Sequence, residues 1–535
     1  MLSVGKGMRM KKIGLFFLYA FSGFFCAVPL VCPKLWVFFW VGPVPVLLSE
    51  LYFNRESTTL PRAWGRGFLF FFCYGYTAFS WFWGIYPIDS LGFTRGEALA
   101  VVILATLGIP ALQGMFSAFV FVYCSFVNKK GYSRRHPILS GMGAACLWAF
   151  FEWLQTLTFL GVPWGRAAVG QGENLPIIQC LSLFGPYFLT FLCIFTASLL
   201  AFSAYSFVGR KRKEGGLAIA FAFLLFFGNY TYGALKINLS DLSKGESVKV
   251  AAIQGNVLYE DRFPDKAAYI EETYRALTLE ACVEGAELIL WPETALPYDI
   301  SSDEGFTDYI LSVQRESSAD IVATFFNRDT EGLKNVAVAV TADGMGESFY
   351  EKRALVPFGE YLPMEGFINA VCPPLAQFTK LNDPVTAGDR AVVLETESLK
   401  LCPLICYDSV FEELCRQGVS LGGNIICIST NDSWFSGSCA LCQHEMQGRL
   451  RCVENGKYGV RAANTGNSSV ISPTGELLAM LGEGETGYIT ADIYEVEETT
   501  LYTKIGNAVI PVFIVYTLII TLAAGRRKTD GYSNR

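Results

Sequence analysis

The sequence predicts a chain of two parts, a bundle of about eight membrane-spanning α-helices and a soluble α/β domain. Three observations predict this division. Apolar residues make up 52% of the 535 residues and charged residues only 17%, a balance that is too apolar for an ordinary soluble protein. Long apolar runs are confined to the two ends of the chain. The segment between them is acidic and alternates short apolar strands with helical patterns.

Eight apolar runs are each near or above the roughly 20 residues that a helix needs to cross the hydrocarbon core. They lie at residues 13–31, 35–53, 67–85, 98–127, 139–160, 186–208, 215–235 and 505–524. The first run also has the basic start and apolar core of a cleaved signal peptide, but no clean small-x-small site follows it. We therefore expect it to remain as a membrane span.

The short loops on alternate sides of these spans differ sharply in basic residues. Counted from the N-terminus, one set of loops and termini contains 19 Lys and Arg, whereas the opposite short loops contain only Lys34, Arg95 and Arg166. Basic loops stay on the cytoplasmic side of a membrane. This pattern predicts cytoplasmic termini and an acidic domain on the far side, which in a bacterium is the periplasmic side of the inner membrane.

The acidic segment at residues 246–496 is the predicted soluble domain. It contains 17 Lys and Arg against 38 Asp and Glu, which argues against nucleic acid as a partner. Polar linkers bracket it at 236–245 and 497–504. We therefore divide the chain into residues 1–245 with seven spans, residues 246–496 as the extracytoplasmic domain, and residues 497–535 with the eighth span and a cytoplasmic tail.

Strands and helices alternate along this domain. Short apolar runs bounded by polar turns predict buried strands at 248–254, 288–291, 321–326, 336–340, 399–405 and 425–429. Helices are expected over residues 266–284 and 444–454. The alternation predicts an α/β fold for the domain.

Cysteine is abundant, and one cysteine occupies a position suited to catalysis. Nine of the 16 cysteines lie in the domain, so full pairing there would leave one free. Cys439 and Cys442 form a C-x-x-C without a second pair at zinc spacing, so we expect no metal and no cofactor. Cys406 follows an apolar strand and precedes a helix expected to start near Asp408 or Ser409. Such a turn favours a thiolate and offers N–H donors to an oxyanion, although a buried core cysteine fits equally well.

A nucleophilic cysteine needs a proton acceptor and charge stabilisation. His136 lies in a predicted cytoplasmic loop, and His444 precedes a helix where a structural role is the simpler interpretation. Glu293 follows the strand at 288–291, where desolvation can raise the pKa of a carboxylate and suit it to general-base chemistry; a helix cap or surface turn is the alternative. Lys352 can donate to a tetrahedral oxyanion or form an ordinary exposed salt bridge.

Together, Glu293, Lys352 and Cys406 occur in the order of the Glu–Lys–Cys triad of the nitrilase superfamily, and the chain resembles the apolipoprotein N-acyltransferase family within it. The motifs that carry the resemblance are WPETALP at 291–297, EKRALVPFGEYLP at 351–363, ICYDS at 405–409, NDSWF at 431–435 and GVPWGRAAVGQ at 161–171. The resemblance implies a four-layer α/β/β/α sandwich. It also implies that Glu293 is the base, Cys406 the nucleophile and Lys352 the group that stabilises the tetrahedral intermediate.

The same resemblance implies supporting roles for further residues. Glu360 would orient Lys352, while Tyr407 and Trp434 would shape the acyl pocket and its gate. Asp408 stands where the family usually has Glu, and because its shorter side chain reaches less far, its role stays open. Phe263 stands where a Trp is expected.

The activity implied is acyl transfer from a phospholipid donor to the N-terminal amine of a diacylated lipoprotein, through a thioester on Cys406. The alternative enzyme is a membrane-tethered amidase that hydrolyses C–N bonds with the same triad. A scaffold or transporter with an inactive domain is disfavoured by the intact triad and by the scarcity of charges inside the spans. Glu152, inside the fifth predicted span, is expected to be structural, and the apolar stretch 367–378 could enter the membrane or pack in a core.

Overall fold

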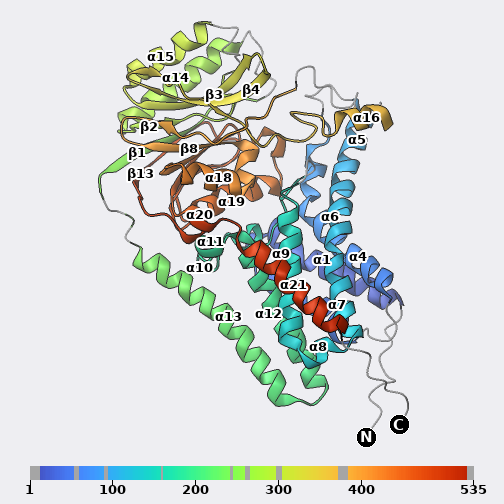
Figure 1. The fold of residues 1–535 in the computed structure, drawn as a ribbon. Helices are drawn as coiled ribbons and strands as arrows, with labels where there is room; N and C mark the ends of the chain where they lie inside the picture. The colour runs from blue at the N-terminus through green and yellow to red at the C-terminus, as the bar shows by residue number, and fades with distance from the viewer. Residues whose placement is uncertain are drawn as a thin grey trace, which may run out of the picture.

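The computed structural model describes residues 12–53, 59–88, 94–157, 161–240, 242, 245–258, 266–296, 304–371 and 384–526. Helices built from the apolar ends of the chain form a bundle, and the α/β domain lies against one end of it (Figure 1). Phe263 and most of the stretch 367–378 fall outside the described residues or their described side chains.

The bundle combines long helices with short connecting ones. Its helices are α1 (Lys12–Val31), α2 (Phe38–Val41), α3 (Val44–Leu48), α4 (Leu60–Ala78), α5 (Arg95–Ile103), α6 (Ile109–Ser117), α7 (Phe119–Lys129), α8 (Tyr132–Arg135), α9 (Pro137–Leu154), α10 (Leu175–Ile178), α11 (Leu181–Phe184), α12 (Pro186–Val208), α13 (Arg212–Leu239), α20 (Leu501–Ile505) and α21 (Val509–Arg526).

Six helices in the described part of the chain are long and apolar enough to cross a membrane. They are Ile13–Val31, Arg95–Lys129, Pro137–Leu154, Pro186–Val208, Arg212–Leu239 and Val509–Arg526, and each overlaps a predicted span. The predicted span 35–53 is instead a shorter, interrupted helical stretch, and Pro43, which lacks a backbone N–H, lies at the break between α2 and α3. The predicted span 67–85 overlaps α4, which starts earlier and so includes Arg62 and Arg66.

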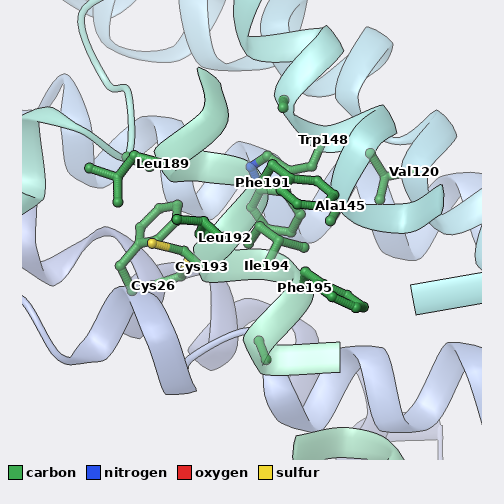
Figure 2. Packing of buried hydrophobic residues seen from close by; sticks show 14 of the residues in the cluster. Cys26, Val120, Ala145, Trp148, Leu189, Phe191, Leu192, Cys193, Ile194 and Phe195 are labelled. Atoms are coloured by element: carbon green, nitrogen blue, oxygen red, sulfur yellow. The ribbon is translucent and has the colours of Figure 1, made fainter. Parts of the chain in front are cut away.

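The centre of the bundle is α12, whose side chains are buried all round. Its residues Phe191–Phe195 pack among Trp148 of α9, Val120 of α7 and Cys26 of α1 (Figure 2). The outer helices show the opposite distribution, since Leu217 and Leu224 on α13 are 72% and 66% exposed. Apolar side chains that face outward around a packed helical core are typical of a protein surrounded by lipid.

The domain contains two sheets among the described residues. The first has the order β13–β1–β2–β3–β4–β5, with β6 also paired to β4, and the second has the order β12–β11–β10–β9–β8–β7. Their strands are β1 (Ser247–Gln254), β2 (Leu288–Leu290), β3 (Asp320–Asp329), β4 (Gly332–Thr341), β5 (Gly344–Met345), β6 (Tyr350–Glu351), β7 (Leu394–Glu395), β8 (Lys400–Ile405), β9 (Ile425–Thr430), β10 (Tyr458–Ala463), β11 (Ser468–Ile471), β12 (Leu477–Leu481) and β13 (Gly487–Tyr494).

Three apolar layers hold the domain together. Helices α14 (Ala267–Val283) and α15 (Glu304–Ser317) cover the first sheet, and α18 (Glu412–Ser420) and α19 (Cys439–Asn455) cover the second. A third buried cluster joins the inner faces of the two sheets. The order helix, sheet, sheet, helix confirms the predicted α/β/β/α sandwich. A further helix, α16 (Glu365–Val371), lies outside these layers (Figure 1).

The strand pairing decides where a site can form. Strands β1, β2 and β3 are parallel, as are β8, β9 and β10. The carboxyl ends of parallel neighbours meet at one edge of a sheet, which is where α/β proteins place their ligands. The predicted strands that carry Glu293 and Cys406 at their ends are β2 and β8.

The loop at residues 161–171 joins the bundle to the domain. Arg166 is fully buried, and its Nη1 lies 2.5 Å from Oε2 of Glu412 on α18. Its Nη2 donates to the carbonyl oxygen of Val410 at 2.5 Å. Although burial raises the pKa of Glu412, the charges of Arg166 and Arg451 outweigh it and lower that pKa, so the pair is ionic.

Glu152 supports the same loop from inside the bundle. Its Oε1 accepts the backbone N–H of Ala167 at 3.3 Å, and its Oε2 accepts the hydroxyl of Thr190 on α12 at 2.5 Å. These contacts tie α9, α12 and the loop together, which is the structural role expected for this carboxylate.

Arg166→Gln should lower the free energy of unfolding by about 3–5 kcal/mol, because it leaves the Glu412 carboxylate buried without its main partner. The matched control is Lys211→Gln, which breaks the exposed pair of Lys211 and Glu214 and should cost no more than about 1 kcal/mol. Denaturant unfolding of the full chain in detergent measures both. Equal losses in the two variants would contradict the account of this junction.

Candidate active site

Cys406 occupies a strained turn at the end of β8. A 3-10 turn at Cys406–Val410 follows the strand, and the φ angle of Cys406 is +50°, in the left-handed region. A non-glycine residue held there costs on the order of 1–3 kcal/mol and persists only where its surroundings fix it. The helix expected after this turn is present as α18, but it starts at Glu412 with Phe411 as its N-cap residue, so the cap expected at Asp408 or Ser409 was wrong.

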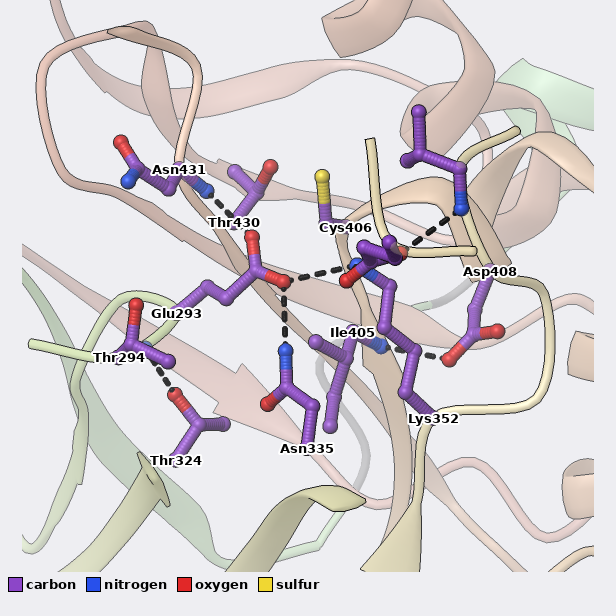
Figure 3. A network of polar contacts seen from close by, with 12 residues as sticks. Glu293, Thr294, Thr324, Asn335, Lys352, Ile405, Cys406, Asp408, Thr430 and Asn431 are labelled. Atoms are coloured by element: carbon purple, nitrogen blue, oxygen red, sulfur yellow. Dashed lines mark hydrogen bonds and ion pairs between the residues drawn. The ribbon is translucent and has the colours of Figure 1, made fainter. Parts of the chain in front are cut away.

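Glu293 lies in a buried turn just after β2. Its Oε1 accepts hydrogen bonds from Nδ2 of Asn335 and Nζ of Lys352, both at 2.9 Å, and its Oε2 accepts the backbone N–H of Asn431 at 3.1 Å (Figure 3). The turn itself is fixed by Thr324, whose hydroxyl accepts the backbone N–H of Thr294 at 2.8 Å. The carboxylate is therefore a buried, oriented group and neither a surface turn nor a helix cap.

Lys352 connects two carboxylates in the interior. Its Nζ donates to Glu293 at 2.9 Å and to Oε1 of Glu360 at 2.7 Å, and the side chain is only 2% exposed. Burial alone would lower the pKa of Lys352, but the two carboxylates outweigh it and raise that pKa. Glu360 is held in turn by the backbone N–H of Val356 at 2.8 Å. The exposed salt bridge considered for Lys352 is thus excluded, and Glu360 contacts Lys352 as expected.

The thiol of Cys406, which follows a strand of the second sheet, lies near the ion pair of Glu293 and Lys352 (Figure 3). Burial raises the pKa of Cys406, the charge of Glu293 raises it further, and Lys352 offsets only part of the rise. The sequence-based expectation of a favoured thiolate was therefore wrong for the resting site. Such a thiol could act as a nucleophile only if a base took its proton, and the carboxylate of Glu293 is oriented beside it.

Asp408 connects the segment 350–354, which contains Lys352, to the turn that follows β8. Its Oδ1 accepts the backbone N–H groups of Arg353 at 3.1 Å and Ala354 at 2.7 Å. Its Oδ2 accepts the hydroxyl of Tyr350 at 2.8 Å and the backbone N–H of Ile405 at 3.1 Å. Although shorter than Glu, this side chain reaches both segments, so it can set the position of Lys352 relative to Cys406.

Tyr407 and Trp434 lie in different surroundings. Tyr407 is buried, and its hydroxyl donates to the carbonyl oxygen of Gly161 in the bundle loop at 3.1 Å. Its ring lines a cavity of about 680 Å³ between the end of α9, residues 353–361 and the start of α18. Trp434 is 41% exposed on a short turn and does not line that cavity in the described part of the chain.

Sequence reasoning missed several groups that complete the site. Asn335 and Tyr350 supply side-chain donors from strands β4 and β6. Asn431 contributes its backbone N–H, which no residue type reveals. Asn431 is the first residue of the NDSWF motif, so the motif pointed to this residue. The motif alone does not reveal that the backbone N–H, and not the side chain, binds Glu293.

Among the described residues, no group of three or more His, Cys, Asp or Glu side chains is arranged to hold a metal ion. The cysteines in those ranges, including Cys406, Cys439 and Cys442, are free thiols. The sulfur at the centre of the site is thus available for covalent chemistry.

Comparison with known proteins agrees with the fold. Residues 22–199 match the family described as Apolipoprotein N-acyltransferase N-terminal domain, and residues 249–500 match Carbon-nitrogen hydrolase. An apolipoprotein N-acyltransferase from Gloeobacter violaceus is 29% identical over 497 residues, which cover 92% of this chain and 91% of that protein. One from Borreliella burgdorferi is 30% identical over 399 residues, which cover 71% of this chain and 74% of that protein.

Solved structures of the nitrilase superfamily resemble the domain. An amidase from Nesterenkonia is 18% identical with a TM-score of 0.39, covering 51% of this chain and 99% of its own. Nit3 from Saccharomyces cerevisiae is 19% identical with a TM-score of 0.37, covering 46% of this chain and 90% of its own.

The fold and the buried Glu–Lys–Cys cluster define a membrane-bound enzyme of the nitrilase superfamily. The chain belongs to the apolipoprotein N-acyltransferase family, and it is an acyltransferase.

The pH dependence of stability tests the environment of Asp408. Burial raises the pKa of Asp408 to about 6, more than its hydrogen bonds lower it. An acid whose folded pKa exceeds its unfolded value of about 3.9 stabilises the fold at low pH, and this contribution is lost as the pH rises through 6. Between pH 4 and 6.5, wild type should therefore lose about 2 kcal/mol more unfolding free energy than the non-titrating variant Asp408→Asn. Parallel curves for the two proteins would contradict this.

Proposed function

We propose that the protein transfers an acyl chain from a phospholipid to the N-terminal amine of diacylglyceryl-cysteine in lipoproteins, the last step of lipoprotein maturation. The observation that carries the proposal is the convergence of Glu293, Lys352 and Cys406 in a domain held against one end of a membrane bundle. The names of the relatives and the lipid-facing helices support the same substrates.

In the first half-reaction, the carboxylate of Glu293 takes the proton of Cys406 and the thiolate attacks the ester carbonyl of the phospholipid. The carbonyl oxygen becomes an oxyanion, which the ammonium of Lys352 stabilises. When the tetrahedral intermediate collapses, the C–O bond breaks, and the lysophospholipid leaves with the proton held by Glu293. A thioester between Cys406 and the acyl chain remains.

In the second half-reaction, the amine of the lipoprotein attacks the thioester carbonyl. Glu293 accepts the proton of that amine, the C–S bond breaks, and Cys406 recovers its proton. The new amide links the acyl chain to the lipoprotein. Because Lys352 stays bonded to two carboxylates, it can remain charged through both steps.

The membrane bundle gives this chemistry its substrates. Both the donor and the acceptor keep their chains in the bilayer, and extracting a chain into water costs about 0.8 kcal/mol per CH₂. The cavity beside Tyr407 has walls from Trp153, Leu157 and Phe411, which suit an apolar chain. The 19 basic residues on one set of loops support a location in the bacterial inner membrane with the domain on the periplasmic side.

Hydrolysis of C–N bonds by the same triad is the second candidate. Water would then replace the lipoprotein amine, and no membrane bundle would be needed. Incubation of the full chain with phospholipid and a diacylated lipopeptide separates the two activities, because transfer gives an amide product and hydrolysis gives free acid alone.

Intact-protein mass spectrometry after exposure to phospholipid should show one acyl adduct on Cys406 that hydroxylamine releases. Glu293→Gln should slow its formation by at least about 100-fold, because the thiol loses its proton acceptor. Cys406→Ala should abolish the adduct. Cys415→Ala, which removes a buried thiol on α18, is the matched control and should still acylate. An adduct that persists in Cys406→Ala would overturn the proposed function.

A further inference from the structure

His444 is a buried imidazole that the acyl-transfer steps above do not use. It lies on α19 and is 1% exposed. Its Nδ1 lies 2.9 Å from Oδ1 of Asp432, and its Nε2 lies 3.2 Å from the backbone carbonyl oxygen of Cys406. The ring therefore contacts the backbone of the nucleophile.

Asp432 anchors one side of the ring. Its Oδ2 accepts from Nη2 of Arg461 at 2.6 Å, and its Oδ1 accepts from the hydroxyl of Thr430 at 2.9 Å. Although burial raises the pKa of Asp432, the charge of Arg461 and the contacts of Asp432 with Arg461 and His444 outweigh it and hold that pKa well below the usual range. Nη2 of Arg461 also lies 3.2 Å from Nδ1 of His444, so Asp432 and Arg461 together hold this side of the ring.

The other side of the ring meets the strained turn. The hydroxyl of Ser409 donates to the carbonyl oxygen of Cys406 at 2.7 Å and lies 3.2 Å from Nε2 of His444. Ser409 belongs to the same turn, whereas His444 comes from a separate helix. Because the φ angle of Cys406 is +50°, a contact from outside the turn helps to fix its conformation.

The anchor of His444 also adjoins the residue that holds the base. Asn431 donates its backbone N–H to Glu293 at 3.1 Å, and Asp432 is the next residue in the chain. The segment 431–432 therefore contacts the carboxylate of Glu293 on one side and, through His444, the carbonyl of Cys406 on the other.

We propose that His444, held by Asp432, is a positioning residue that fixes the backbone of Cys406 and so sets the separation between its thiol and the carboxylate of Glu293. This inference deepens the proposed function, on which it rests for the identity of the reacting groups. His444 moves no proton to or from the substrate in this account.

The loop at 161–171, which connects two helices of the bundle, also contacts His444 and its neighbour on α19. The ring of Trp164, from the loop at 161–171, lies over His444 with centroids 5.5 Å apart. The indole N–H of Trp164 donates to Gln443, whose amide in turn donates to the carbonyl oxygen of Leu30 on α1 at 2.7 Å. The position of the nucleophile is therefore linked through α19 to the membrane helices.

Two amide variants of the full chain separate the two sides of the ring. The amide of His444→Gln reaches the position of Nε2 and can still donate to Cys406, whereas the amide of His444→Asn reaches only the position of Nδ1 and Asp432. With phosphatidylethanolamine vesicles, we expect acyl-adduct formation to fall about 10–100-fold in His444→Asn and no more than about 5-fold in His444→Gln. We expect similar decreases in the thermal unfolding midpoint for both variants.

Faster acylation in His444→Asn than in His444→Gln would overturn the positioning role. The role would also be overturned if the acylation rates of both variants simply followed their thermal unfolding midpoints. Alkylation of Cys406 by iodoacetamide, followed by peptide mass spectrometry, provides a readout that needs no acyl transfer. We expect the rate of Cys406 alkylation to change more in His444→Asn than in His444→Gln. If wild type takes no acyl group, the proposed function fails, while the alkylation order still tests the role of His444.

Discussion

The rest of the site depends on the ion pairs that the ammonium of Lys352 makes with Glu293 and Glu360. Two carboxylates, Glu293 and Glu360, share a water-poor interior with a thiol, and without a cation there they would repel one another. Removing one partner from such a buried cluster leaves an uncompensated charge, which is far more costly than losing a surface pair. Glu293, Lys352 and Glu360 therefore hold one another in place through their opposite charges.

The fold supplies the framework for these ion pairs. Glu293 lies just after strand β2 of the first sheet, Cys406 lies just after strand β8 of the second, and Lys352 follows the short strand β6. The two sheets must therefore pack face to face for the site to exist. Asp408 joins the lysine segment to the nucleophile turn, and Arg166 joins that turn to the membrane bundle. A chain that lost the bundle would lose contacts that directly hold Tyr407 and Val410.

Much of this arrangement could be predicted from the sequence, because strong local patterns carry it. The apolar runs that became β2 and β8 located Glu293 and Cys406 at strand ends, and a family resemblance supplied the four layers. The two-residue strands β5, β6 and β7 were not predicted because so short a pairing has no periodicity, and the longer strands β10 to β13 were not predicted either. The interrupted span at 35–53 was predicted as a single helix because it is apolar apart from Ser49 and Glu50.

Contacts made by the backbone were the hardest to foresee. The N–H groups of Asn431, Arg353 and Ala354 bind carboxylates from distant segments, and every residue except proline carries such a group. The state of the thiol was also predicted wrongly, since a turn before a helix suggested a thiolate. Burial and the neighbouring charge of Glu293 decide that question, and both depend on tertiary packing.

The pH dependence of Cys406 alkylation in the full chain tests the central claim most directly, namely that the resting nucleophile is a protonated thiol served by Glu293. Iodoacetamide labelling read at the Cys406 peptide should accelerate about tenfold per pH unit from pH 6 to 9 without reaching a plateau. A rate that is already maximal below pH 7 would reveal a preformed thiolate and contradict the account.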